Sequence, residues 1–501
     1  CADCAAAERG SVAAPGPQRK ISSFLKFGHG KSNAVPTAPA TNVSEKTPSN
    51  QNVFVIDLSH VQSQKQSIKE QEANYNPYLN RQVSHPTSTF ETLLHLLKGS
   101  LGTGILAMPK AFTHSGYVLG ILGTLFIGLI CTYCIHLLIK VQYAMCIRRR
   151  TPKLSYTGTA EEALKDGPPV FKALAPYAQH IVNAFLLLYQ LGSCCVYFVF
   201  VADSLKKIMD EYIADYAVQL YMLVILVPIT SLCMIKNLKK LVPVSSIANV
   251  ITFISYGIII YFLFSAGPTL EGRVAIGQDV KTYPLFLGTV LFALEAIGVM
   301  LPLENEMKHP KKFGGNCGVL NQGMFSIIIL YIFMGMLGYM AHGDAAQGSI
   351  NLNMPRDNVL AQAVLALLGL SVFLSYSLQF YVAIRIVLDD YCPAKWRKGK
   401  NKSKYDNGIR VALVLLTFSL AASFPKIDIF ISLVGAFCLS GLGIGFPAII
   451  ELSAYWYENR GWNFVWLLVR NLLLIVMCCT GLISGTYASV CDIVDYFQKT
   501  H

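Results

Sequence analysis

Runs of about 20 apolar residues recur along this chain from Thr89 onward, and they constrain its fold more than any other feature. A helix of that length crosses a hydrocarbon core of about 30 Å. Only 14% of the 501 residues are charged, whereas soluble proteins carry about 25%. Much of the surface must therefore face lipid, where a helix satisfies its own backbone groups.

We predict an all-α integral membrane protein with 11 transmembrane helices. They cover residues 90–112, 116–142, 176–203, 216–235, 242–266, 284–307, 317–341, 358–388, 410–424, 427–451 and 463–490. The transmembrane domain is expected over 89–498. Residues 1–88 contain Pro, Ser, Asn, Gln and Lys without a sustained period. This composition predicts a mostly disordered tail.

Lysine and arginine residues in the loops gather on one side of the predicted membrane. They cluster at 148–153, 236–240, 308–312 and 395–404. The positive-inside rule makes this side cytosolic, together with the N-terminal tail. An odd number of helices then places the C-terminus outside the cell or in a lumen. The net charge of +12 reflects this orientation and attraction to anionic lipid, and it does not predict nucleic-acid binding.

The first predicted helix is interrupted by three glycines. Gly99, Gly102 and Gly104 lie close together within it, and each weakens a helix by about 1 kcal/mol relative to alanine. Such a break is tolerated in a membrane where it lines a cavity or packs against another helix. Close helix packing alone is the competing explanation for the glycines.

The sixth predicted helix carries a matching interruption. Glu295 lies near its middle and is followed by Gly298 and Pro302. The stretch from Gly298 to Pro302 echoes the stretch from Gly104 to Pro109 in the first helix. Breaks at matching positions of two halves indicate inverted repeats with a midplane binding site. The repeats are expected at about 89–266 and 284–451, with helix 11 at about 463–490.

The breaks suggest what the site binds. Backbone N–H groups near Gly102, Thr103 and Gly104 start a half-helix, where the dipole is positive and a carboxylate is stabilised. Carbonyl groups around Phe292 and Leu294 end the other half-helix and suit an ammonium group. A zwitterion such as an amino acid fits both. The predicted binding residues are Gly99, Ser100, Gly102, Thr103, Gly104, Phe292, Leu294, Glu295 and Tyr376. The candidate pocket walls are Tyr197, Phe292 and Tyr376.

Two ionisable residues are candidates for carrying a proton. His95 precedes Gly99 by four residues and Gly102 by seven, so we expect it on the face of the break, toward the bundle interior. Histidine titrates near physiological pH. A charged Glu295 would cost about 2.5–3.5 kcal/mol at the centre of an isolated helix, so it must be protonated, paired or hydrated. A purely structural hydrogen bond remains an alternative for each. The helices show no paired metal-ligand motif and no nucleophile motif, so we predict neither an enzyme nor a metal or cofactor site.

The first helix resembles a known family signature. Its stretch Thr92-Leu-Leu-His95-Leu-Leu-Lys98-Gly-Ser-Leu-Gly-Thr-Gly-Ile-Leu-Ala-Met-Pro109 is similar to helix 1 of the proton-coupled amino acid transporters, in the amino acid/auxin permease group. The blocks Cys194–Asp203, Gly348–Asn353 and Leu378–Val382 resemble further parts of that family. The sequences of these blocks are most similar to those of insect members.

This resemblance implies a LeuT/APC-like fold of five-plus-five inverted repeats with broken helices 1 and 6. It implies symport of protons with small neutral amino acids such as glycine, alanine and proline, by alternating access into the cytosol. It implies that His95 senses or carries the proton. Members occur in the plasma membrane and in endosomal or lysosomal membranes. Ser100 departs from the family, because many relatives have Asn there. An amino-acid sensor that signals through the tail to partners, with little flux, is the alternative function.

Overall fold

The computed structural model describes residues 75–81, 83, 86–212, 215–236, 238–294, 297–315, 317–355, 357–393 and 402–500. Within these residues the secondary structure is helical, apart from an isolated bridge between Thr87 and Met307. The all-helical prediction is therefore confirmed for this part of the chain. The tail predicted over 1–88 lies outside the described residues as far as residue 74 and again at 82, 84 and 85.

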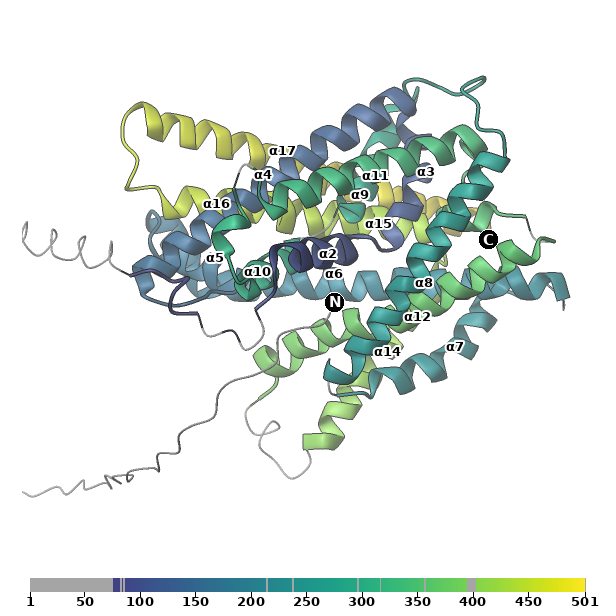
Figure 1. The fold of residues 1–501 in the computed structure, drawn as a ribbon, viewed down its shortest axis with the longest axis horizontal. Coiled ribbons are helices and arrows are strands. Elements are labelled where there is room, and N and C mark those ends of the chain that lie inside the picture. The colour runs from purple at the N-terminus through teal and green to yellow at the C-terminus, as the bar shows by residue number, and fades with distance from the viewer. Residues whose placement is uncertain are drawn as a thin grey trace, which may run out of the picture. The chain divides into compact units, whose positions relative to one another are not determined.

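Eight helices of the described chain are long and apolar enough to cross a membrane. They contain α4 (Tyr117–Arg149), α6 (Pro169–Tyr212), α8 (Leu238–Ser265), α11 (Val319–His342), α12 (Val359–Ile386), α14 (Lys402–Ser423), the continuous run of α15 (Ile427–Val434), η6 (Gly435–Gly445) and α16 (Phe446–Ala454), and α17 (Trp462–Thr500). Figure 1 shows these helices side by side in the bundle. The predicted number of eleven is not reached by this criterion, because α7 (Val218–Cys233) has only 16 residues and two other predicted helices are divided.

The two divided helices are the ones in which breaks were predicted. The first consists of α2 (Thr89–Ser100) and α3 (Thr103–Ser115). The sixth consists of α9 (Tyr283–Ala293), which follows the 3₁₀ turn η1 (Val280–Thr282), and α10 (Ile297–Glu306). Short 3₁₀ turns follow at η2 (Pro310–Lys312), η3 (Gly343–Ala345) and η4 (Ile350–Asn353). Both breaks therefore divide a span into half-helices that are each too short to cross a membrane alone.

Two elements differ from the sequence-based expectation. The tenth predicted helix contains a π-helical stretch, η6, in which a side chain at Gly435 would place its Cβ 1.9 Å from the Gly288 carbonyl oxygen. Glycine is needed there because α9 and η6 touch through their backbones. The short helix α5 (Tyr156–Lys165) was not predicted, since it has no apolar run of membrane length. The Tyr156 hydroxyl donates to the Leu442 carbonyl at 2.7 Å and holds α5 on η6.

The segment before α2 is packed against α10 and the loop after α4. The Arg81 guanidinium bonds the Glu304 carboxylate at 3.0 Å and the Pro152 carbonyl at 2.9 Å. The Thr87 N–H donates to the Glu306 carbonyl at 2.9 Å, and the Lys308 N–H donates to the Thr87 carbonyl at 2.9 Å. We call these contacts the α2–α10 clip, and they join the beginning of one broken helix to the end of the other.

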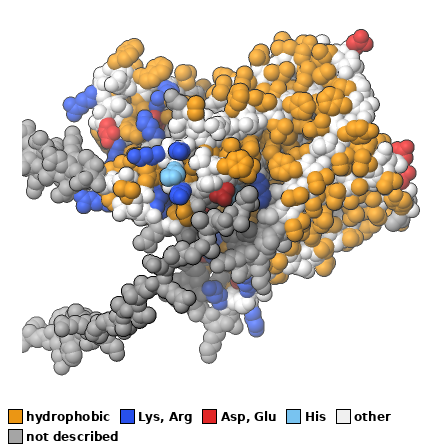
Figure 2. Space-filling view, in the orientation of Figure 1, with side chains coloured by type: hydrophobic (Ala, Val, Ile, Leu, Met, Phe, Trp, Pro, Cys, Tyr) orange, Lys and Arg blue, Asp and Glu red, His pale blue; other side chains and the backbone are white. Residues whose placement is uncertain are grey.

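The outer surface is suited to lipid. Figure 2 shows hydrophobic side chains over most of one face, with Lys and Arg gathered toward the side where Figure 1 places α5 and α10. On α17, Leu473 is 65% exposed and Ile483 is 66% exposed. Apolar surface of this extent is not stable in water, so these helices face the membrane interior.

Candidate functional site

The first break is stabilised by two tyrosines from distant helices. Gly102 is extended between Ser100, which ends α2, and Thr103, which begins α3. The Tyr256 hydroxyl on α8 donates to the Gly102 carbonyl at 2.8 Å, and the Tyr331 hydroxyl on α11 donates to the Ser100 carbonyl. A backbone carbonyl that loses its helical hydrogen bond raises the free energy of the folded protein in lipid. The two tyrosine hydrogen bonds therefore offset the cost of the break.

Polar groups at the start of α3 have few protein partners. No side chain caps α3 at Gly102, so the N–H groups of the first turn, at Thr103 and Gly104, lack a capping acceptor. The Ser100 hydroxyl is buried and makes no hydrogen bond with the described chain. An anionic group placed here would meet N–H donors, the positive end of a helix dipole and a hydroxyl.

The second break follows α9. The Leu294 N–H donates to the Val290 carbonyl at 2.9 Å, which is the last bond of the α9 pattern. Phe292 is buried, and its ring centroid lies 6.4 Å from that of Tyr189 on α6. The predicted site residue Glu295 lies outside the described residues.

The two breaks lie against each other. A Cβ atom built on Gly104 would lie 2.6 Å from the Ala293 Cα, which is closer than real contacts permit. The beginning of α3 therefore touches the end of α9. This contact brings a positive helix end and a negative helix end together, as recognition of a zwitterion requires.

His95 lies off the buried face of its helix. The buried residues of α2 are Thr92, Leu96 and Ser100, whereas His95 and Gly99 are exposed. His95 shares the exposed face of α2 with Gly99, four residues away, as its spacing from the break predicted. Its direction toward the bundle interior stays a prediction. Its role in proton coupling stays a prediction.

The three candidate pocket walls are in different places. Tyr197 has its hydroxyl 4.0 Å from the Cβ position of Gly102, and Phe292 lies beside the second break. Tyr376 is fully buried, and its hydroxyl pairs with the Thr417 hydroxyl at 2.8 Å. Its ring packs 5.7 Å from that of Phe198. These contacts place Tyr376 among α6, α12 and α14, so a direct role at the breaks stays a prediction.

Sequence reasoning missed Tyr256 and Tyr331. A tyrosine within an apolar helix must find a partner for its hydroxyl, and that signal was present. However, the chain contains 25 tyrosines, so the signal does not single out the two that contact the first break.

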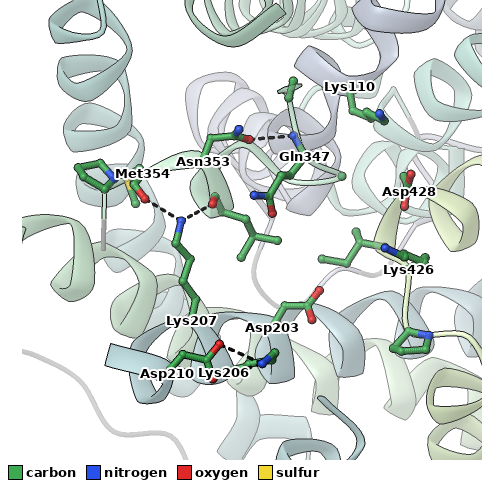
Figure 3. A pocket seen from close by; sticks show the side chains of 16 residues that line it. Lys110, Asp203, Lys206, Lys207, Asp210, Gln347, Asn353, Met354, Lys426 and Asp428 are labelled. Atoms are coloured by element: carbon green, nitrogen blue, oxygen red, sulfur yellow. Dashed lines mark hydrogen bonds and ion pairs between the residues drawn. The ribbon is translucent and has the colours of Figure 1, made fainter. Parts of the chain in front are cut away.

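A cavity of about 670 Å³ lies beyond the breaks (Figure 3). Lys110 lines it from α3, seven residues past Thr103, which is about 10 Å along the helix. Asp203 lines it from α6, six residues past Tyr197, which is about 9 Å. Opposite walls come from the segments 346–355 and 425–428. In the described part of the chain, no group of three or more His, Cys, Asp or Glu side chains is arranged to hold a metal ion.

Comparisons with known proteins identify relatives of the chain. A family model described as "Transmembrane amino acid transporter protein" matches residues 85–491. The "Proton-coupled amino acid transporter-like protein pathetic" of Drosophila melanogaster is 39% identical over 428 residues, which cover 85% of this chain and 89% of the relative. The "Vacuolar amino acid transporter 4" of Saccharomyces cerevisiae is 26% identical over 437 residues, which cover 80% of this chain and 58% of the yeast protein.

A solved structure shares the fold. The inward-facing conformation of Mhp1 superposes with a TM-score of 0.53 at 13% sequence identity, covering 84% of this chain and 92% of that chain. At this identity the similarity concerns the arrangement of helices alone.

Proposed function

Because the chain belongs to the transmembrane amino acid transporter family, we propose that it carries small neutral amino acids of the glycine, alanine and proline class into the cytosol together with protons. The family and the fold are those of multi-pass membrane transporters, not enzymes. The proton in the proposal is supported by the printed name of the fly relative. The residues of the two breaks support the substrate class.

The contact between Gly104 and Ala293 carries the proposal for the binding site. The substrate carboxylate binds the N–H groups of Thr103 and Gly104 and the unpartnered Ser100 hydroxyl, where the α3 dipole is positive. The ammonium group binds carbonyl groups at the end of α9. The rings of Tyr197 and Phe292 flank the breaks and favour a small side chain.

Proton coupling is assigned to His95 and Glu295. The His95 ring is exposed, which leaves it accessible to a proton, and histidine is the side chain best suited to reversible protonation under physiological conditions. On the acidic side, a proton binds to His95, which becomes positive, or to Glu295, which becomes neutral, as the substrate binds. The proton is then released on the cytosolic side together with the substrate. Protons are then the coupling ion, and no other cofactor takes part.

The architecture proposed for this cycle is the five-plus-five repeat. Repeat one runs from α2 to α8, repeat two runs from α9 to α16, and α17 is appended. The breaks after α2 and after α9 support this division, because each occurs in the first helix of a repeat. The basic loops are assigned to the cytosol, and the membrane is the plasma membrane or that of a lysosome or endosome.

Uptake by the purified protein in liposomes tests the proposal. Labelled glycine, alanine, proline, leucine and glutamate are compared at external pH values about one unit below and above the usual histidine pKa of about 6.5. We expect the first three to accumulate faster at the acidic pH, with inward current, and we expect a proton ionophore to abolish accumulation. Uptake that ignores both pH and ionophore would exclude proton coupling, and binding without flux would exclude transport.

A further inference from the structure

The cavity beyond the breaks lies at the end of the bundle opposite the basic loops. α6 begins at Pro169, next to the basic segment that follows α4, and Asp203 lies 34 residues further on. At 1.5 Å per residue that distance is about 50 Å, which is enough to cross a membrane with its head groups, about 40–45 Å thick. A volume of about 670 Å³ falls within the range of about 300–1,000 Å³ that small-molecule sites occupy.

The cavity wall formed by residues 346–355 is held by specific bonds. The Lys207 ammonium donates to the Met354 carbonyl at 2.7 Å and to the Leu352 carbonyl. The Asn353 side chain accepts from the Gln347 N–H and donates to the Ala345 carbonyl, both at 2.8 Å. Figure 3 shows the two bonds of Lys207 and the bond between Asn353 and Gln347 on one side of the cavity. These hydrogen bonds fix the conformation of the wall, so that it can position a ligand.

Two of the cavity lysines are already engaged by protein groups. Lys207 holds the wall, and Lys206 pairs with Asp210 at 2.9 Å and with Asp215. Four charged side chains remain, and none of them makes a side-chain hydrogen bond or ion pair with another residue of the described chain. They are Lys110, Asp203, Lys426 and Asp428.

The four remaining charges come from three different elements. Figure 3 shows the Asp203 carboxylate pointing into the cavity from α6, with Lys426 and Asp428 on the opposite wall and Lys110 on α3. Asp203 lies within electrostatic range of Lys426 and Asp428. Two ammonium and two carboxylate groups give no net charge, so the cavity favours neither simple anions nor simple cations. A zwitterion satisfies both signs at once, because its ammonium can bind one wall while its carboxylate binds the other.

We propose that this cavity is a second amino-acid site, in which Asp203 binds the ammonium group and Lys426 and Lys110 bind the carboxylate. The inference rests on the proposed transport function, since the site would load substrate before it reaches the breaks. It recognises only the charged groups shared by all amino acids. Selection by side chain is then left to the breaks, about 10 Å deeper along α3.

Uptake kinetics of the full chain in liposomes provide the first test, with alanine as the probe. Asp203→Asn and Lys426→Met should each raise the half-saturating concentration about tenfold, or about 1.4 kcal/mol, with little change in the maximal rate. Glu271→Gln and Lys281→Met serve as matched controls, because both residues are exposed in the loop between α8 and α9 and do not line the cavity. A lower maximal rate with unchanged half-saturation would indicate a closing gate and overturn the proposal.

Occupancy of the cavity can be measured without transport. Gln347 lines the cavity, so Gln347→Cys should react with a membrane-impermeant methanethiosulfonate reagent, relative to the unsubstituted chain. Alanine at about ten times its dissociation constant should slow this reaction about tenfold, and Asp203→Asn should remove the protection. Protection without uptake would refute the transport proposal and leave the second site standing. Normal uptake without protection would refute the second site alone.

Discussion

At Gly104 the space between α3 and α9 accommodates a hydrogen atom and nothing larger. The Cβ of any other residue would lie 2.6 Å from the Ala293 Cα and 3.2 Å from its Cβ. Ala293 cannot move aside at low cost, because its Cα belongs to the backbone of α9. The approach of the two broken helices therefore depends on this residue having no side chain.

Gly104→Ala should separate α3 from α9 and lower the maximal rate of uptake at least about tenfold, because small misplacements of binding groups are costly. The matched control is Gly408→Ala on α14, where the new methyl group meets nothing within 4 Å. There we expect unchanged uptake and a small gain in stability from the better helix former. Unfolding temperature in detergent, measured alongside uptake, separates misfolding from a displaced site. Unimpaired uptake by Gly104→Ala would contradict the close contact.

Tyr256→Phe removes the hydroxyl that pairs with the Gly102 carbonyl. The unpaired carbonyl costs about 1–3 kcal/mol in a buried site, so we expect a lower unfolding temperature and weaker substrate binding. Tyr261→Phe is the control, since Tyr261 is on the same helix and is 61% exposed. If both variants behave alike in unfolding and uptake assays, the tyrosine contact does not stabilise the break.

At the scale of elements, the α2–α10 clip connects the two broken helices. Arg81 and Glu304 are 4% and 1% exposed in their side chains, so the pair is buried at the end of α10. The backbone bonds of Thr87 then align the beginning of α2 with that end. The clip therefore links α2 to α10 through both side-chain and backbone bonds.

Arg81→Met should destabilise the protein by about 3–5 kcal/mol, because it leaves the Glu304 carboxylate buried and unpaired. Adding Glu304→Met to this variant should recover most of the loss. Arg149→Met is the comparison, since Arg149 is 37% exposed in its pairs with Glu162 and Asp166, and exposed pairs contribute about 0–1 kcal/mol. A denaturant series on the three variants measures these differences, and equal losses for Arg81→Met and Arg149→Met would show that the clip is not buried.

At the scale of the whole molecule, hydrophobic surface and basic loops together define how the chain lies in the membrane. The exposed side chains of α8 and α17 are largely apolar. The loop between α10 and α11 contains Lys311, Lys312 and the exposed Cys317. The loop between α8 and α9 contains Glu271. It lies at the end of the bundle opposite the loop between α10 and α11.

Sealed microsomes, which expose the cytosolic face, test the orientation. An impermeant thiol reagent should modify Cys317 in intact vesicles, as read by mass spectrometry of its peptide. Glu271→Cys should react only after detergent opens the vesicles, because the positive-inside rule assigns that loop to the lumen. The reverse pattern would invert the topology and the direction of transport inferred from it.

Much of the architecture was predictable because its causes are local. Apolar runs predict spanning helices. A glycine cluster predicts the break between α2 and α3, and Glu295 followed by Gly298 and Pro302 predicts the break between α9 and α10, and both breaks are present. The polar start of α14 and the amphipathic helix α5 were missed, since neither has a membrane-length apolar run. The π-helical stretch η6 was missed because its cause, close backbone contact with Gly288, lies in another part of the chain.

The sequence by itself determined that this chain spans a membrane, where two of its helices break and which family signature the first break carries. Hydrophobicity, glycine content and loop charge act over a few residues, so they can be read in order along the chain. Only the tertiary structure decided that Tyr256, 154 residues away, donates to the first break, that His95 lies off the buried face of α2, and that unpaired charges from α3, α6 and α15 share one cavity. These features depend on which helix faces meet, and that is settled by the packing of the whole bundle rather than by any one segment.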